Sequence, residues 1–309
     1  MKKTKRPTRT LFDIIKTKDI NELITVEANS PVMEALMIMA KFKIGSDLRQ
    51  QFNVIGIKRN TISNFHDFKI ICLNIFDPAF DETLTKINPE YVIYSIAADD
   101  QLPSSYQKAY FDGLKMSIKS IKENCPKFNH LFFISSTRVY GQNNHNIMTE
   151  KTLPEPNDFG GDALYNGELA LLKSDISTSI LRLSGIYGEN RTHLIKMAQN
   201  HSSWPKENRW TNRIYDQDAV NFITFLLNQL QKNIAIEPLY LVTDNSPALL
   251  YDVLNHIRGL MGLKAIHFEP NDTYDGKQLK SLIIPKTEFI FNYPTYEDGY
   301  NFIIENLNK

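Results

Sequence analysis

The sequence has few of the features that mark several large classes of protein. Its 309 residues include two cysteines, Cys72 and Cys125, isolated thiols without metal-ligand spacing, which are typical of a reducing cytoplasm. The 35 Lys and Arg balance the 35 Asp and Glu, so net charge favours neither nucleic acid nor an anionic membrane as a partner. No run approaches the roughly 18 apolar residues of a membrane span, and the basic start, Lys2–Arg9, lacks the apolar region of a secretory signal. We therefore expect a cytoplasmic protein with a solvated basic tail and no metal centre.

What the sequence does contain is a core-forming composition and one informative central stretch. Hydrophobic residues make up 42% and charged residues 23%, which is ordinary for a globular chain of one large domain or two. Leu131–Ser135 is predicted to be a short buried strand, and it ends in the hydroxyl cluster Ser135, Ser136 and Thr137. Ligands of an open parallel sheet bind outside the carboxyl ends of its strands, so these hydroxyls are placed for chemistry. The alternative is that they only satisfy backbone groups where the strand stops.

Three stretches in order along the chain resemble one family. S-S-x-x-V-Y-G (135–141), Ser179–Gly188 and Glu90–Asp99 are similar to core segments of the extended short-chain dehydrogenases/reductases, the NAD(P)-dependent epimerase/dehydratase family. The resemblance covers about 46–309. It implies an α/β fold, a Rossmann-like parallel sheet with helices on both faces, with an NAD(P)-binding core over 46–188. The remaining sheet elements and a small C-terminal substrate subdomain would follow over 189–309.

The resemblance also implies site residues. Ser136 or Thr137 would hydrogen-bond a substrate carbonyl or hydroxyl, and Tyr165 would be the one nearby candidate proton donor, although a surface or core role for Tyr165 is the alternative. The cofactor-binding positions implied by the resemblance are Lys58, Arg59, Asn74, Ile75, Ala97, Ala98, Ser135, Gly185 and Ile186.

The basic pair Lys58-Arg59 bears on the choice of cofactor. It follows a predicted strand, Phe52–Ile57, at the position where an acid usually holds the NAD ribose and a basic residue suits the 2′-phosphate of NADP. The pair therefore predicts NADP. The alternative is an ordinary exposed basic pair after a strand.

Two functional motifs of the family are missing. Aligning the family pattern places Ala40 and Phe42 at the first two glycines of G-x-G-x-x-G, whose backbone approaches the cofactor pyrophosphate. The Tyr and Lys of the family's Y-x-x-x-K fall on Gly160 and Leu164. NADP binding is therefore expected to be weak or absent. An atypical subset of the family has G-x-A-L-x-x-x-E here instead, a pattern that 161–168 fits.

The first 45 residues resemble something different. Leu11–Gly45 is similar to the first half of a CBS domain, a module that binds adenosine nucleotides. We expect a strand over Leu23–Glu27 in the vacant first-strand position and a helix over Val32–Lys43 that begins at Ser30-Pro31. A loosely packed segment beside an incomplete sheet is the alternative.

Three functions follow from these observations. The first is an NAD(P)-dependent epimerase, dehydratase or reductase acting on a small molecule, one of nucleotide-sugar type, with impaired cofactor binding. The second is a non-catalytic descendant with a scaffold or sensing role. The third, an adenylate sensor built on residues 10–45, has only half a module. A small-molecule substrate is the expected partner, and the sequence does not decide between a monomer and a homodimer.

Overall fold

The computed structural model describes residues 34–39 (backbone), 48, 51–59, 68–142, 146–269 and 274–307. The chain divides into two compact units. The first consists of 1–132 with 170–178, and the second of 133–169 with 179–309. The segments β5 (His130–Ser136), α7 (Phe159–Leu172) and β7 (Thr178–Leu183) run from one unit into the other along the chain. Each unit is described by itself.

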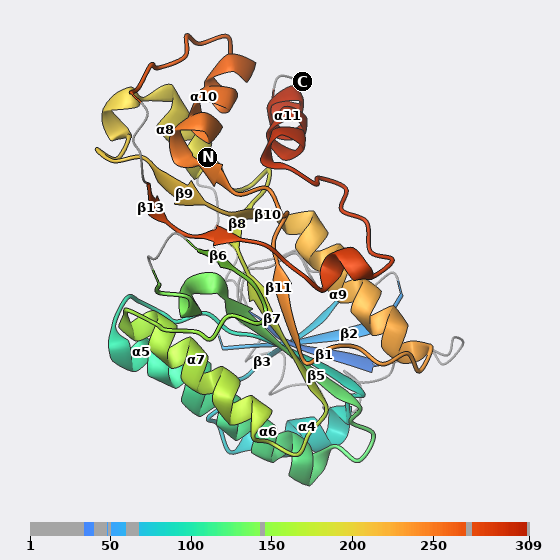
Figure 1. The fold of residues 1–309 in the computed structure, drawn as a ribbon. Coiled ribbons are helices and arrows are strands. Elements are labelled where there is room, and N and C mark those ends of the chain that lie inside the picture. The colour runs from blue at the N-terminus through green and yellow to red at the C-terminus, as the bar shows by residue number, and fades with distance from the viewer. Residues whose placement is uncertain are drawn as a thin grey trace, which may run out of the picture. The chain divides into compact units, whose positions relative to one another are not determined.

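The first unit is built on parallel strands in the order β4-β1-β2-β3. Their bounds are Glu34–Met39 (β1), Asn53–Lys58 (β2), Lys69–Cys72 (β3) and Tyr91–Ser95 (β4). The chain passes from β1 outward to β3 and then returns to the other side of β1, where Ala35 aligns with Tyr91 (Figure 1). Such a reversal of strand order creates the crevice in which Rossmann-like proteins bind ligands. The α/β fold with a parallel sheet is as predicted.

Strand β1 corrects the prediction for the start of the chain. Residues 34–39 were expected within a helix over Val32–Lys43, yet they form a strand paired with β2 on one side and β4 on the other. Glu, Ala, Leu and Met all favour helices, but a central slot in a parallel sheet pairs backbone groups on both sides, and this tertiary context overrides propensity. The first-strand position is thus filled by Glu34–Met39 and not by Leu23–Glu27. That segment and the CBS-like region other than Glu34–Met39 lie outside the described residues.

Helices of the first unit follow the predicted pattern. Apolar residues at helical spacing, among them Leu114 and Ile121, predict a helix over 103–124 with a buried stripe. The structure forms it as α5 (Pro103–Gln107), a π-helical turn (Lys108–Asp112) and α6 (Gly113–Asn124), and α4 spans Ala79–Ile87. Leu114 and Ile121 of α6 are buried as predicted. The hydroxyl of Tyr94 donates to the carbonyl of Ala109 in the π turn over 2.6 Å. Gly113 packs so closely on Tyr94 and Ile75 that a Cβ there would overlap both side chains.

The second unit combines one parallel strand pair with smaller sheets. β7 pairs in parallel with β11 (Leu239–Val242), and β8 (Gly185–Tyr187) pairs in parallel with β10 (Arg213–Tyr215). Short strands form two further sheets: β9 (Arg209–Thr211) between β12 (Ala248–Leu249) and β13 (Asp275–Gly276), and β6 (Ile147–Met148) beside β14 (Gln278–Leu279). The unit also contains α9 (Asp216–Gln231) and the 3₁₀ turns η2 (Thr137–Val139), η3 (His201–Ser203) and η4 (Ile284–Lys286).

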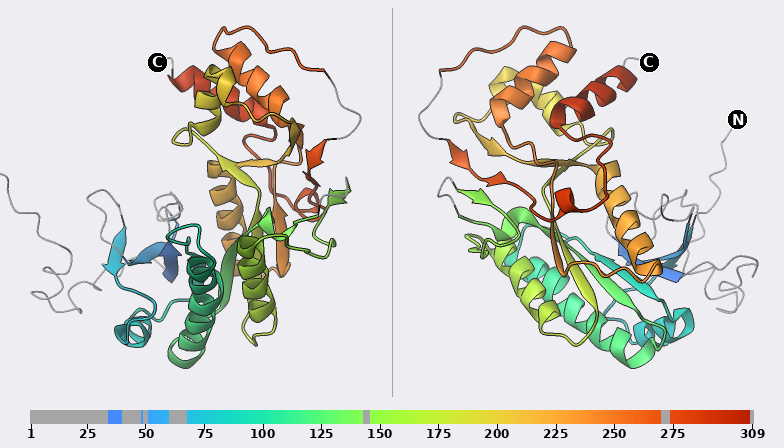
Figure 2. Two further views of the ribbon diagram at one scale, coloured as in Figure 1. Left: turned by 90° about the vertical axis from the view of Figure 1, so that its left-hand side faces the viewer. Right: turned by 45° about the vertical axis from the view of Figure 1, so that its right-hand side comes forward.

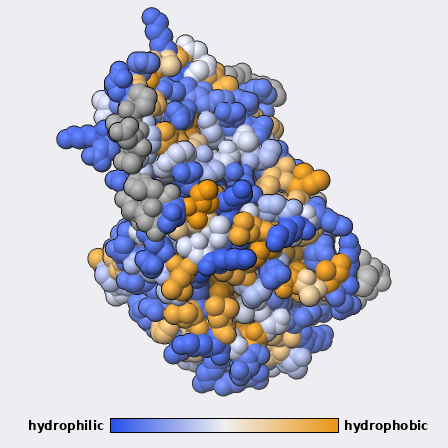
Figure 3. Space-filling model, in the orientation of Figure 1, coloured by the Kyte–Doolittle hydropathy of each residue, from blue (hydrophilic) through white to orange (hydrophobic). Residues whose placement is uncertain are grey.

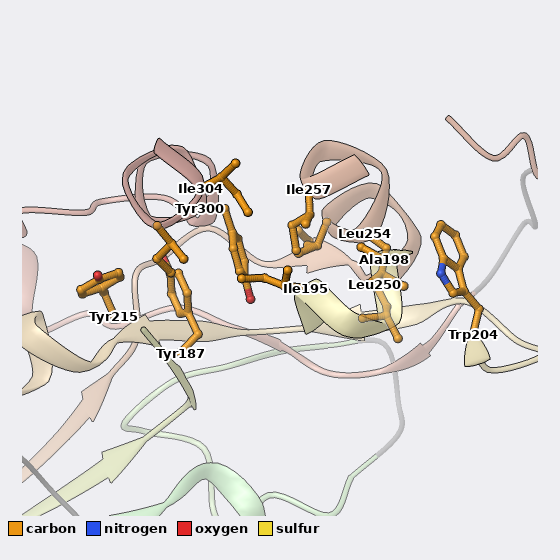
Figure 4. Close-up of a cluster of buried hydrophobic side chains, with 13 residues drawn as sticks. Tyr187, Ile195, Ala198, Trp204, Tyr215, Leu250, Leu254, Ile257, Tyr300 and Ile304 are labelled. Atoms are coloured by element: carbon orange, nitrogen blue, oxygen red, sulfur yellow. The ribbon is translucent and has the colours of Figure 1, made fainter. Parts of the chain in front are cut away.

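A separate core lies among α8 (His193–Gln199), α10 (Leu250–Leu260) and α11 (Tyr296–Leu307), which the views in Figure 2 show together. The rings of Tyr187 and Tyr300 stack with centroids 4.9 Å apart at one end of this core, and Trp204 closes the other (Figure 4). Ser246-Pro247 predicts the start of a helix that Gly262 closes, but Ala248–Leu249 form strand β12 and α10 begins after them at Leu250. Gly262, with φ +69°, follows the helix as predicted.

The surface is mixed in character. On the face shown in Figure 3, apolar residues form patches among hydrophilic ones. Some large apolar side chains, such as Leu153 and Ile290, are exposed to solvent. None of the helices in the described ranges combines the length and apolar character that a membrane span requires.

Candidate active site

A pocket of ≈ 530 Å³ lies in the second unit, where β5 has ended. It is lined by Arg138 and 140–142 of the loop that follows β5, by 157–158, by 205–209, and by 275–277. The S-S-x-x-V-Y-G stretch thus supplies one wall, as the resemblance implies for its substrate side. The other walls come from segments that the sequence analysis assigned to the substrate subdomain or left without a role.

The Arg138 side chain covers Gly160, the residue that aligns with the family's tyrosine. The Nε atom of Arg138 donates to both carboxylate oxygens of Asp158, over 2.9 and 3.0 Å. The guanidinium lies on Gly160, where an added Cβ would overlap its central carbon. It also faces the ring of Phe159, 5.4 Å from its centroid. Gly160 is the position aligned with the family's tyrosine, and the lysine position, Leu164, is buried and apolar.

Asp158 is held as an anion in this arrangement. Burial raises the pKa of Asp158. The N–H of Gly161, which donates to Oδ1 over 2.7 Å, and the Arg138 guanidinium lower this pKa by a larger amount, so it lies below the ordinary value. The pocket therefore has a fixed ion pair at its wall.

Lys277 contributes to this wall from the segment between β13 and β14. Its Nζ donates to the carbonyl of Thr137 over 2.8 Å and to the carbonyl of Tyr140. The backbone that presents it is fixed by Gly276, with φ +89° against Trp210, and by Asn212, whose side chain donates to the Lys277 carbonyl over 2.7 Å. Burial lowers the pKa of Lys277 to about 8, while the charge of Asp158 acts in the opposite direction. The sequence places Gly276-Lys277-Gln278 in the expected C-terminal substrate subdomain but predicts no role for Lys277 in the site.

Behind the pocket wall lies a fully buried polar network. Glu168 of α7 accepts the Ser135 hydroxyl over 2.5 Å and the Arg182 guanidinium over 2.6 Å. Arg182 also donates to the Tyr140 hydroxyl over 2.6 Å and lies on its ring. Tyr140 in turn donates to the carbonyl of Thr149. This network fixes the end of β5, α7 and β7 to the loop that forms the pocket.

The structure places the predicted hydroxyl residues differently. Ser135 is buried and donates into the network, while the Ser136 hydroxyl accepts the N–H of Arg138 over 3.2 Å. Thr137 is buried, and its carbonyl holds Lys277. Tyr165 is half-buried, and it makes no hydrogen bond to any described residue. A contact of these groups with cofactor or substrate stays a prediction.

In the first unit, the predicted cofactor residues gather at the carboxyl ends of strands. Arg59 follows β2, and Asp99 lies shortly after β4. The two form a bidentate ion pair, with one N–O distance of 2.7 Å. Because β1 lies between β2 and β4, the pair joins the loops on either side of the β1 end. The Arg59 hydrogen bond lowers the pKa of Asp99.

The other predicted cofactor positions are less constrained. The Asn74 carboxamide accepts the N–H of Phe76 over 3.1 Å, and Ile75 is buried against Gly113. The remaining positions are half-buried or exposed: Lys58, Ala97, Ala98 and, in the second unit, Gly185 and Ile186. Among the described residues, no cluster of His, Cys, Asp and Glu could hold a metal ion.

The parallel sheet with its reversal of strand order defines a Rossmann-like α/β protein. The model of the RmlD substrate binding domain matches residues 33–218, and the chain belongs to that family. The match begins just before β1, which supports this strand as the start of the fold.

Solved structures agree. A putative NAD-dependent epimerase/dehydratase from Methylobacillus flagellatus is 27% identical with a TM-score of 0.80, covering 91% of this chain and 100% of that one. dTDP-glucose 4,6-dehydratase from Bacillus anthracis, in complex with NAD, is 15% identical with a TM-score of 0.71, and the match covers 89% of this chain and 96% of that one. UDP-glucuronic acid 4-epimerase from Bacillus cereus, also in complex with NAD, is 20% identical with a TM-score of 0.69, and the match covers 90% of this chain and 100% of that one. Among curated proteins, none matches this sequence.

Proposed function

We propose that this protein acts on a hydroxyl or carbonyl group of a small, nucleotide-sugar-type molecule in a reaction linked to NAD(P), with weakened cofactor binding. The observation that carries the proposal is the pocket of ≈ 530 Å³ that follows β5, where Lys277 and the Arg138–Asp158 pair are fixed against the S-S-x-x-V-Y-G stretch. Two of the similar structures are named for dTDP-glucose and UDP-glucuronic acid, which supports the substrate class.

The residues of the first unit fit a dinucleotide in part. The strand order builds the crevice, and Arg59 would hold the 2′-phosphate of NADP while Asn74 and Ile75 flank the adenine. Against this, the Arg59 guanidinium is engaged by Asp99, and Ala40 and Phe42 stand in place of glycines after β1. When bound, the dinucleotide supplies hydride transfer.

The residues of the second unit would orient the substrate. The Arg138–Asp158 pair and the Lys277 ammonium present hydrogen-bond donors to polar groups in the pocket, and the buried Glu168–Arg182 network keeps the loop in place. Ser136 and Tyr165 stay candidates for contact with the reacting group.

Titration with NADPH and NADH, followed by fluorescence of the nicotinamide, tests the cofactor side. Losing several charge-assisted hydrogen bonds from a phosphate loop, each worth about 1.5–3 kcal/mol, predicts weak binding of NADPH and weaker binding of NADH. A sub-micromolar dissociation constant would contradict weakened binding, and equal affinities would contradict the role of Arg59.

A non-catalytic function is favoured by one specific observation: the Arg138 guanidinium lies against Gly160, the residue aligned with the family's tyrosine, and leaves no room for a side chain there. A scaffold or sensor would bind a nucleotide sugar in the same pocket without converting it. Incubation with UDP-glucose, UDP-glucuronic acid and dTDP-glucose plus NADP, followed by mass spectrometry and a thermal shift, separates the two functions. Conversion of any sugar supports the enzyme, whereas stabilisation without conversion supports the alternative.

A further inference from the structure

The ammonium group of Lys277 has an unusual environment for a lysine that lines a pocket. A lysine amine has four tetrahedral positions, one of which is its own carbon chain. Two of the other three carry the hydrogens that bind the carbonyls of Thr137 and Tyr140. The last position has no hydrogen-bond partner among the described residues, and Lys277 lines the pocket.

We propose that Lys277 is the proton-transferring residue of this pocket, replacing the missing tyrosine and lysine of the family. In the neutral amine, the two N–H groups bind the two carbonyls and the lone pair occupies the last position. In the ammonium, that same position carries the third proton. The group can therefore gain or lose one proton without releasing either carbonyl.

This inference rests on the proposed function, and its chemical step balances. A substrate O–H bond breaks as its proton passes to the Lys277 lone pair, forming an N–H bond. The hydride that leaves the carbon would need an acceptor, which an oxidised dinucleotide would supply when bound. In the reverse direction, the ammonium returns the proton to a carbonyl oxygen.

The charges around the pocket are compatible with this role. The charged residues that line it with Lys277 are Arg138, Asp158, Lys206, Glu207, Arg209 and Asp275. Asp158 favours the ammonium, but its charge is shared with Arg138. Burial therefore dominates and brings the pKa of Lys277 to about 8, against an ordinary lysine value of about 10.4, so both protonation states are accessible near neutral pH.

The position of Lys277 also depends on tertiary structure and not on local sequence. Gly276 adopts a left-handed φ of +89° and packs on Trp210, and the Asn212 side chain binds the Lys277 carbonyl. The same Asn212 accepts the Leu279 N–H with its side-chain oxygen over 2.8 Å. The backbone on both sides of Lys277 is thereby fixed, which is what a proton-transfer group requires.

The test is the pH dependence of chemical modification of Lys277 in the full-length protein. An amine-acylating reagent is applied in short pulses from pH 6 to pH 11, and modification of each lysine is read by peptide mass spectrometry. We expect Lys277 to react with a midpoint near pH 8, and UDP-glucuronic acid to slow its reaction. A midpoint near pH 10 would overturn the proposal, as would an unchanged rate with UDP-glucuronic acid at a concentration that stabilises the protein thermally.

Two variants sharpen the test. Asp158→Asn removes the charge that favours the ammonium, so the midpoint should fall below that of the wild type. Lys280→Met changes an exposed lysine of the same segment and should leave the Lys277 midpoint unchanged.

Turnover separates this inference from the proposed function. If a nucleotide sugar is converted, Lys277→Arg should lower kcat at least tenfold and remove the limb of the pH–rate profile near 8, with a smaller effect on KM. Unchanged turnover in Lys277→Arg would overturn the inference while leaving the proposed function intact. No conversion of any sugar, together with a Lys277 midpoint near 8, would refute the proposed function and still support an amine poised for proton transfer.

Discussion

Each unit of the molecule contains an arginine–aspartate pair near its predicted ligand, and the two pairs differ in what surrounds them. Arg59 and Asp99 have side chains 47% and 53% exposed and join two loops across the end of β1. Arg138 and Asp158 are 32% and 39% exposed, and they are supported by the Gly161 N–H and the Phe159 ring. The same chemistry thus serves as a surface contact in one unit and as part of a pocket wall in the other.

The comparison indicates how much each pair contributes to stability. An exposed pair gains about 0–1 kcal/mol, because water and salt screen it and two long side chains lose freedom. Burial changes this, as Glu168 and Arg182 show: their side chains are 0% and 4% exposed, so neither charge can be removed without stranding the other. The four predictions below test the contrast, in order of decreasing effect.

The first prediction concerns β1, which the first unit is expected to need in order to fold, whereas the basic tail Met1–Arg9 is expected to be dispensable. Deleting residues 1–45 removes β1 and leaves β2 and β4 without their shared partner. We expect an insoluble chain, or one without cooperative thermal unfolding, because open strand edges promote aggregation. Deleting only Met1–Arg9 is the control and should change little. A soluble, cooperatively folded 46–309 chain would show that β1 is dispensable.

The second prediction compares the buried pair with the exposed one. Glu168→Gln leaves the buried Arg182 charge uncompensated and should lower the free energy of unfolding by about 3–5 kcal/mol. Asp99→Asn, its match in the first unit, should cost less than about 1 kcal/mol. Urea unfolding of both variants measures the difference. Similar losses in the two would remove the distinction drawn here.

The third prediction concerns pH and a carboxyl group of the second unit. Burial raises the pKa of Asp244 to about 7, and its Oδ2 has no hydrogen-bond partner in the part of the chain that the structure describes. The unfolded value is about 3.9, so between these values the folded state binds more protons than the unfolded state. Stability should therefore fall by about 2–4 kcal/mol as pH rises from about 4 to 7.

Asp244→Asn mimics the protonated carboxyl and should flatten that part of the stability profile measured by urea unfolding at a series of pH values. A wild-type profile that is already flat, or that rises over this range by the same amount in both proteins, would contradict the effect of burial on Asp244.

The fourth and smallest prediction is about the dinucleotide. Asp99→Asn releases the Arg59 guanidinium, so NADPH affinity should rise about fivefold, corresponding to roughly 1 kcal/mol. Arg59→Ala should abolish any preference for NADPH over NADH. Fluorescence titration measures both, and the gain in Asp99→Asn should shrink at high salt because both side chains are exposed. An affinity unchanged by Asp99→Asn would show that the pair does not compete with the 2′-phosphate.

Much of the fold was predictable because the elements that carry it have strong local patterns. The apolar runs that became β2 and β5 and the periodic helix over 103–124 were predicted from their residues, and the segments that became β4 and β7 were predicted from the family resemblance. Glu34–Met39 was not, since its residues favour a helix in isolation and only two neighbouring strands make it a strand.

The site was predictable only where the sequence keeps neighbours together. The stretch 135–141 was recognised as a wall of the site, but Lys277 lies 140 residues from Thr137 along the chain, and only folding brings their atoms into contact. Only one part of the change at Gly160 could be predicted from the sequence. Loss of the tyrosine could be read from the alignment, whereas its replacement by the guanidinium of Arg138 depends on a side-chain orientation that no local pattern encodes.

The contact between Arg138 and Gly160 makes the effects of two substitutions depend on their order. A tyrosine introduced at Gly160 meets the Arg138 guanidinium, which would have to leave Asp158 to admit it. With Arg138 first replaced by a smaller residue, the same tyrosine would enter open space and would approach the unpaired Asp158. A lineage, or an engineer, that restores the family's tyrosine must therefore lose the arginine first. Because of this sign epistasis, the order of the two substitutions determines whether the intermediate protein has a steric overlap at position 160.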